Sequence, residues 1–170
     1  MIGTGAGILT GIIICIIVFK LVNKDGNAKT KYDEMQERIR GKAYMYGFWA
    51  MLACEAIMLI VDTGDVKLPV EPYITHITVI LIGALVQTSY SIWNDAYVGL
   101  NTNMRRFAII SILVSLLNFL IAGAAIASSR MLVDGVFQSP LANLLCGLLF
   151  CIIGIELFIK MLSDKNAKED

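Results

Sequence analysis

The chain has 170 residues, of which 57% are hydrophobic and 16% are charged, and its mean hydropathy is +0.72. Soluble domains usually carry about 25% charged residues, so this composition excludes an ordinary soluble protein and favours an integral membrane protein. The 14 Lys and Arg residues balance the 14 Asp and Glu residues, which removes any bulk electrostatic argument for nucleic acid or for an acidic substrate. The lipid bilayer is the first expected partner, and no nucleic acid is expected.

Five apolar segments are long enough to cross a hydrocarbon core of about 30 Å, which takes roughly 20 residues of helix. In chain order they are residues 2–22, 43–61, 74–93, 107–127 and 141–162. Because every connector is short, the sequence predicts a single membrane domain over residues 1–170. The expected fold is an all-α integral membrane protein with a five-helix transmembrane bundle. The first segment lacks a basic region before its apolar run, so we interpret it as a true first helix rather than an export signal.

That first segment carries three glycines, Gly3, Gly7 and Gly11, at four-residue spacing on one helix face. Small residues spaced in this way let a second helix backbone approach closely, so we predict a helix-packing face. The helix that packs there belongs either to this chain or to a second copy, and the sequence leaves both a homo-oligomer and a separate protein partner open.

A charged segment precedes the second span. Thr30 and Asp33 resemble a capping box with an acid in place of the usual Glu or Gln. Apolar and aromatic residues then recur at three- and four-residue intervals, which predicts an amphipathic helix over about 31–42 that leads into the second span. Glu34 with Arg38 and Glu37 with Arg40 have the spacing of ion pairs along its solvated side.

Within this segment, YDEMQERIRGKAYMYGF at residues 32–48 resembles the YDERQ…RGKAYKYGF signature of small multi-helix membrane proteins of Firmicutes. That family is mostly uncharacterised and is often encoded beside small helix-turn-helix regulators. The resemblance implies no known reaction; it implies a bacterial inner membrane and an accessory or regulatory role through a cytoplasmic partner. Met35 stands where the signature has arginine. We expect the 30–46 helix to dock a protein partner or lipid headgroups through Tyr32, Asp33, Glu34, Gln36, Arg38, Arg40 and Lys42.

The distribution of basic residues predicts the orientation. Twelve Lys and Arg residues fall on the side that holds residues 20–42, 105–106 and 160–168, whereas the other side has only Lys67 and Arg130. Under the positive-inside rule, this places the N-terminus outside and the C-terminus in the cytoplasm.

Glu55 and Glu156 are the two carboxylates inside predicted spans, where a charge costs at least about 2.5–3.5 kcal/mol. The spacing predicts that Glu156 pairs with Lys160, four residues later. Depth counted along the helices places Glu55 level with Asn118, so one interpretation is a hydrogen bond that joins two helices. The other interpretation is a proton- or cation-handling carboxylate in a polar cavity with Asn118 and Gln87, as in a small transporter or channel.

Motifs for catalysis are missing from the sequence: it has no HExxH, no GxSxG and no phosphate-binding glycine loop. The four cysteines fall inside apolar runs without metal-ligand spacing, and His76 has no metal-binding neighbour in the sequence. We therefore expect a protein that is not an enzyme and that holds no cofactor or metal.

Overall fold

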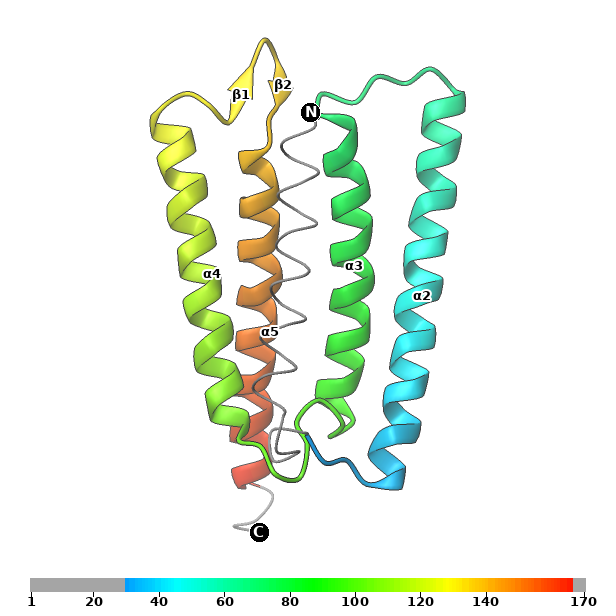
Figure 1. Cartoon of the computed structure of the whole chain (residues 1–170), viewed down its shortest axis with the longest axis vertical. Coiled ribbons are helices and arrows are strands. Elements are labelled where there is room, and N and C mark those ends of the chain that lie inside the picture. The colour runs from blue at the N-terminus through cyan, green and yellow to red at the C-terminus, as the bar shows by residue number, and fades with distance from the viewer. Residues whose placement is uncertain (1–29, 167–170) are drawn as a thin grey trace, which may run out of the picture. The chain divides into compact units, whose positions relative to one another are not determined.

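The computed structural model describes residues 30–166, which form four long helices and one short hairpin (Figure 1). The helices are α2 (Glu34–Thr63), α3 (Pro72–Trp93), α4 (Met104–Ala127) and α5 (Pro140–Asn166). Each is long and apolar enough to cross a membrane, so the described part of the chain has the helical, multi-pass character that the composition predicts. The predicted span at 2–22, with Gly3, Gly7 and Gly11, lies outside the described residues, and the five-helix count and the orientation stay predictions.

α2 begins three residues later than the sequence indicates. Asp33 is the N-cap: its Oδ1 accepts from the Gln36 backbone N at 2.7 Å, and Gln36 Oε1 accepts from the Asp33 backbone N at 3.4 Å. The reciprocal pair is a capping box, so the prediction that Thr30 occupies the cap was wrong. From there α2 runs for 30 residues through both Gly41 and Gly47, a rod of about 45 Å in which the predicted amphipathic segment and the second span are one element.

The other helices begin at residues that suit a first turn. Pro72 and Pro140 open α3 and α5, where the missing backbone N–H costs nothing because the first turn has no partner for it. Asn103 caps α4 by accepting from the Arg105 backbone N at 2.9 Å. These starts lie within three residues of the predicted spans.

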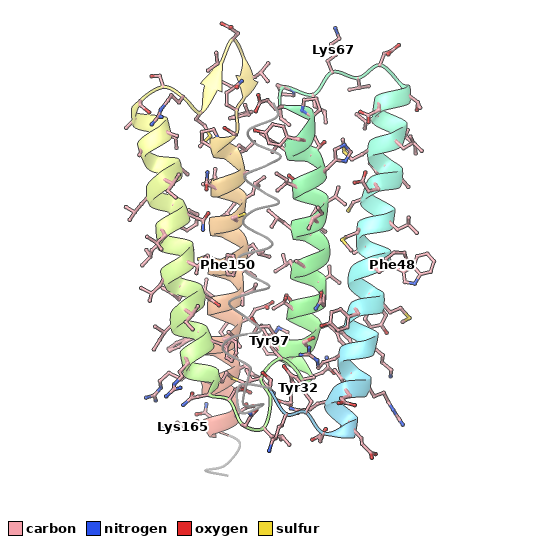
Figure 2. All side chains as sticks on the ribbon, in the orientation of Figure 1. Tyr32, Phe48, Lys67, Tyr97, Phe150 and Lys165 are labelled. Carbon is pink, nitrogen blue, oxygen red and sulfur yellow. The ribbon has the colours of Figure 1, made fainter. Side chains whose placement is uncertain are left out.

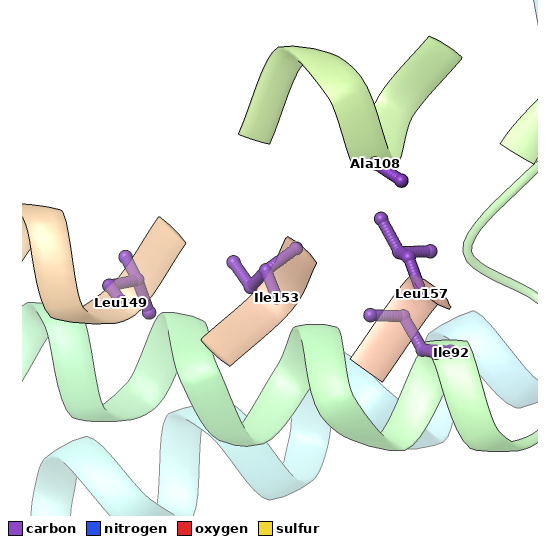
Figure 3. Packing of buried hydrophobic residues seen from close by; sticks show 5 residues of the cluster. All are labelled: Ile92, Ala108, Leu149, Ile153 and Leu157. Atoms are coloured by element: carbon purple, nitrogen blue, oxygen red, sulfur yellow. The ribbon is translucent and has the colours of Figure 1, made fainter. Parts of the chain in front are cut away.

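The described helices lie in a row. α2 packs on α3, α3 on α5, and α5 on α4, so α2 and α4 stand at opposite ends (Figure 1). A buried cluster joins α3, α4 and α5 through Ile92, Ala108, Leu149, Ile153 and Leu157 (Figure 3). Most other large apolar side chains on the four helices are exposed, which suits contact with lipid rather than with water.

Two connectors meet at one end of the row, which we call the hairpin end. β1 (Leu132–Val133) pairs antiparallel with β2 (Val136–Phe137) around Asp134 and Gly135, whose φ angles of 51° and 77° are those a two-residue hairpin turn requires. Phe137 N donates to Pro69 O at 2.8 Å, and Phe137 O accepts from Glu71 N at 3.1 Å. The hairpin is thereby bound to the α2–α3 connector. We call the opposite end, where α2 begins and α5 ends, the basic end.

Glycines set the closest helix contacts among the described residues. A Cβ on Gly47 of α2 would lie 2.8 Å from Gly83 O of α3, and a Cβ on Gly83 would lie 2.9 Å from Gly47 O, so the two backbones touch there. On α5, Gly147 and Gly154 receive the side chains of Phe119 and Ile112 from α4. Ser115 Oγ also donates to Gly147 O at 2.8 Å across the same contact.

Candidate functional site

An acid and an imidazole face each other across α2 and α3. His76 Nδ1 lies 3.0 Å from Glu55 Oε1, so the imidazole and the carboxyl group are within hydrogen-bonding distance. The His76 side chain is 56% exposed and the Glu55 side chain is 43% exposed. Both residues belong to helices that are apolar enough to span a membrane. A carboxylate placed there without a partner would be costly, and the imidazole supplies the partner.

The structure does not assemble the predicted site of Glu55, Asn118 and Gln87. Asn118 Nδ2 donates to Val114 O of its own helix at 2.9 Å. α4 stands at the other end of the row from α2 (Figure 1), so the predicted Glu55–Asn118 bond was wrong. Counting residues gives the depth of a side chain in a span, but it does not say which helices are neighbours. Gln87 lies beside the Gly47–Gly83 contact, with its Cβ 3.0 Å from where a Gly47 Cβ would be.

The Glu55–His76 contact joins two side chains that can each serve as a hydrogen-bond donor or acceptor. Within the described residues, no group of three or more His, Cys, Asp and Glu side chains could hold a metal ion.

At the basic end, the start of α2 is fastened to the loop between α3 and α4. Gln36 Nε2 donates to Asp95 O at 2.6 Å and to Val98 O at 3.3 Å, and Tyr32 Oη donates to the backbone O of Tyr97 at 3.5 Å. Figure 2 shows Tyr32 and Tyr97 at this end, far from Lys67 at the hairpin end. Burial, and then the nearby Tyr32 phenol, raise the pKa of Tyr97 above its ordinary value.

The same loop binds the end of α5. Lys160 Nζ lies 3.0 Å from Asp95 Oδ1 and 3.1 Å from Asp164 Oδ1, and the lysine side chain is only 13% exposed. The predicted pair of Glu156 with Lys160 was therefore wrong. Glu156 Oε2 is buried and makes no hydrogen bond within the described residues. The loop that contains Asp95 thus joins α2, α3, α4 and α5.

The predicted docking residues separate into two sets. Tyr32, Gln36 and Arg40 turn inward: the first two bind the loop, and the Arg40 guanidinium lies 4.0 Å from the centre of the Tyr32 ring. Arg40 also donates to Tyr44 Oη at 3.2 Å. Asp33 is the helix cap.

The other set, Glu34, Arg38 and Lys42, forms together with the exposed Glu37 what we call the charged face of α2. None of them makes an ion pair with another described residue, so the predicted pairs of Glu34 with Arg38 and of Glu37 with Arg40 were wrong. The charged face consists of Glu34, Glu37, Arg38 and Lys42, all exposed.

Sequence reasoning set His76 aside and overlooked the loop. A usable signal existed for His76, because it and Glu55 both lie within about ten residues of the same short connector, on helices that must be adjacent and antiparallel. Gly147 and Gly154 are seven residues apart and therefore share a helix face, which predicts a packing site. Nothing in the sequence pairs Gln36 with the backbone of residues 95–98.

No protein-family model matches the chain, no curated protein matches it significantly, and no solved structure does so.

Proposed function

We propose that this is a non-enzymatic accessory or regulatory protein of a bacterial inner membrane that docks a cytoplasmic protein on the charged face of α2. The observation that carries the proposal is that Glu34, Glu37, Arg38 and Lys42 are exposed and unpaired within the described residues. The helix beneath them is held in place by Gln36 and its loop contacts. A rigid surface of unpaired charges loses little entropy when it binds a complementary surface.

A protein fits this face better than a lipid surface does. Its two acids and two bases sum to zero, so it has no net attraction to anionic headgroups. The acids lie in the first turn of α2, and Arg38 and Lys42 lie nearer the apolar part of the helix. A partner with the opposite order of charges would pair with both sets.

The proposal includes five spans, with the N-terminus outside and the basic end in the cytoplasm. Support comes from the division of Lys and Arg residues, twelve against two. Labelling of single cysteines with a membrane-impermeant thiol reagent tests it in a variant that lacks the four native cysteines. Lys67→Cys should react in intact cells, and Arg38→Cys should react only after lysis.

Membership of the Firmicutes group with the YDERQ signature is also part of the proposal. Its support is the match over residues 32–48 and the roles of the shared residues. Asp33 and Gln36 form the capping box, and Tyr32 and Arg40 stack beside the 95–98 loop. These contacts supply a physical reason for such a signature, because they fix the charged face relative to the membrane helices.

Photocrosslinking tests the docking. A photoreactive residue at position 38 should capture a protein other than the chain itself in living cells. The matched control is position 40, one of the inward set, which should yield only internal crosslinks. Recovery of lipid and self alone from position 38 would contradict a protein partner and favour headgroup binding.

A second candidate function, a proton- or cation-coupled transporter or channel, is favoured by the Glu55–His76 contact. In proteoliposomes under a pH gradient, this function requires a flux that Glu55→Gln and His76→Gln both reduce. Asn118→Leu is the control, because Asn118 bonds only within its own helix among the contacts seen. Flux that both variants leave unchanged would exclude the pair from the mechanism.

A further inference from the structure

The start of α4 carries two arginines that form no ion pair with a carboxylate of residues 30–166. Arg105 and Arg106 are exposed and make no ion pair within the described residues. The sequence has no Asp or Glu from residue 96 to residue 133. The first turn of α4 is therefore net positive, and an anionic group is the complement that the described residues do not supply.

Arg105 also stands at one end of an apolar groove between α4 and α5. The groove has a volume of about 580 Å³, and its walls include the exposed side chains of Ile109, Leu113, Ile155 and Phe158. From Arg105 to Leu113 it follows about 12 Å of α4. The groove is thus apolar along its length, and Arg105 is the cationic side chain at one end of it.

Gly154 shapes this groove. A Cβ at Gly154 would lie 2.6 Å from Ile112 Cδ1, so the side chain of Ile112 packs directly onto the glycine backbone. Because α5 presents no side chain at that position, the floor between the two helices stays low while the residues on either side form the rims. The missing side chain at Gly154 therefore explains both the close packing of α4 on α5 and the groove between them.

We propose that this groove binds an anionic phospholipid, with the phosphate on the Arg105 guanidinium and one acyl chain along Ile109 and Leu113. The occupant must be apolar along its length and anionic at one end. Inorganic phosphate would leave the groove empty, and a zwitterionic lipid such as phosphatidylcholine would bring its own cation beside the guanidinium together with its phosphate. Arg suits the contact because its planar fork of N–H donors matches phosphate oxygens.

The neighbouring arginine provides a matched control. Arg106 lines a different cavity, of about 510 Å³, together with polar residues of the α3–α4 loop that include Asn101 and Thr102. Arg105→Gln and Arg106→Gln remove the same charge from the same helix turn, but only the first removes the cation at the mouth of the groove.

Native mass spectrometry of the full-length protein, titrated with phosphatidylglycerol or with phosphatidylcholine of identical chains, tests the proposal. The wild type should bind the first phosphatidylglycerol more tightly than phosphatidylcholine. Arg105→Gln should lower that preference about fivefold, the effect of one basic contact at a membrane surface. Arg106→Gln should keep the preference close to that of the wild type.

A second pair of variants tests the groove itself. Ile109→Trp places a larger side chain in the groove and should weaken the first binding step for both lipids. Leu116→Trp, on an exposed part of α4 outside the groove, should not. An equal loss in both arginine variants would assign the preference to diffuse surface charge and overturn the proposal. The proposal would also be overturned if Arg105→Gln kept the wild-type preference for phosphatidylglycerol, or if Ile109→Trp and Leu116→Trp weakened the first binding step equally.

Discussion

The contact between Gly47 and Gly83 predicts that one added methyl group separates two membrane helices. In Gly47→Ala, the new Cβ would lie 2.8 Å from Gly83 O and 3.0 Å from Gln87 Cβ, whereas ordinary contact begins at 3.4 Å. α2 and α3 must therefore move apart by about 0.6 Å, the difference between 3.4 and 2.8. Because the nearest atom is a backbone oxygen, no rotamer change relieves the clash. We expect a cost of about 1–3 kcal/mol, as for other overpacked contacts.

Gly41→Ala is the matched control, because a Cβ on Gly41 meets nothing within 4 Å in the same helix. Both substitutions gain the same helix propensity, about 0.8–1.0 kcal/mol for Ala over Gly. The difference between the two variants therefore isolates the interhelical contact. The assay is the free energy of unfolding in mixed micelles, titrated with a denaturing detergent and followed by circular dichroism. Equal stability of the two variants would refute the assignment of this glycine pair as the α2–α3 contact.

Three further predictions concern the polar contacts. Gln36→Ala removes half of the capping box and both bonds to the loop, so it should lower the free energy of unfolding by about 1–2 kcal/mol. Glu37→Ala, at the exposed neighbouring position, should keep the free energy of unfolding within about 0.5 kcal/mol of the wild type. A double-mutant cycle of unfolding free energies with Glu55→Gln and His76→Gln should give a coupling energy near 0.6 kcal/mol, the average for hydrogen bonds between membrane helices. A coupling energy of zero would mean that the contact adds nothing to stability. Burial raises the pKa of Tyr97 in the folded state. The contribution of Tyr97 to stability is therefore complete below the tyrosine pKa of the unfolded chain, near 10, and is lost as the pH rises through the folded pKa. Tyr97→Phe should flatten the alkaline decline in the free energy of unfolding, and an unchanged decline would contradict the shift.

Hydropathy and helix signals were sufficient to predict the spans that the structure describes. A run of about 20 apolar residues has few alternatives to a membrane helix, and Pro72 and Pro140 mark two of the starts. The cap of α2 was misplaced because Thr30 and Asp33 both suit an N-cap, and only Asp33 has a Gln three residues later to complete the box.

The neighbours of each helix could not be predicted in the same way. The row order α2, α3, α5, α4 brings Glu55 to His76 and keeps it from Asn118, although Glu55 and Asn118 have the same predicted depth. Lys160 bonds to Asp95 rather than to Glu156 because the α3–α4 loop folds under α5, and no local pattern encodes that path. Helical spacing says which partners are within reach, and tertiary packing selects among them.

The contact of Gly47 with Gly83 lies between the charged face and Glu55 along α2. Gly47 lies about 13 Å along α2 from Arg38 on the charged face and about 12 Å from Glu55, and α2 is an unbroken helix over this distance. A tilt of the helix about Gly83 therefore moves its two arms in opposite directions by similar amounts. The bonds from Gln36 to the α3–α4 loop oppose such a tilt, so they hold the charged face and the Glu55–His76 pair in one fixed arrangement.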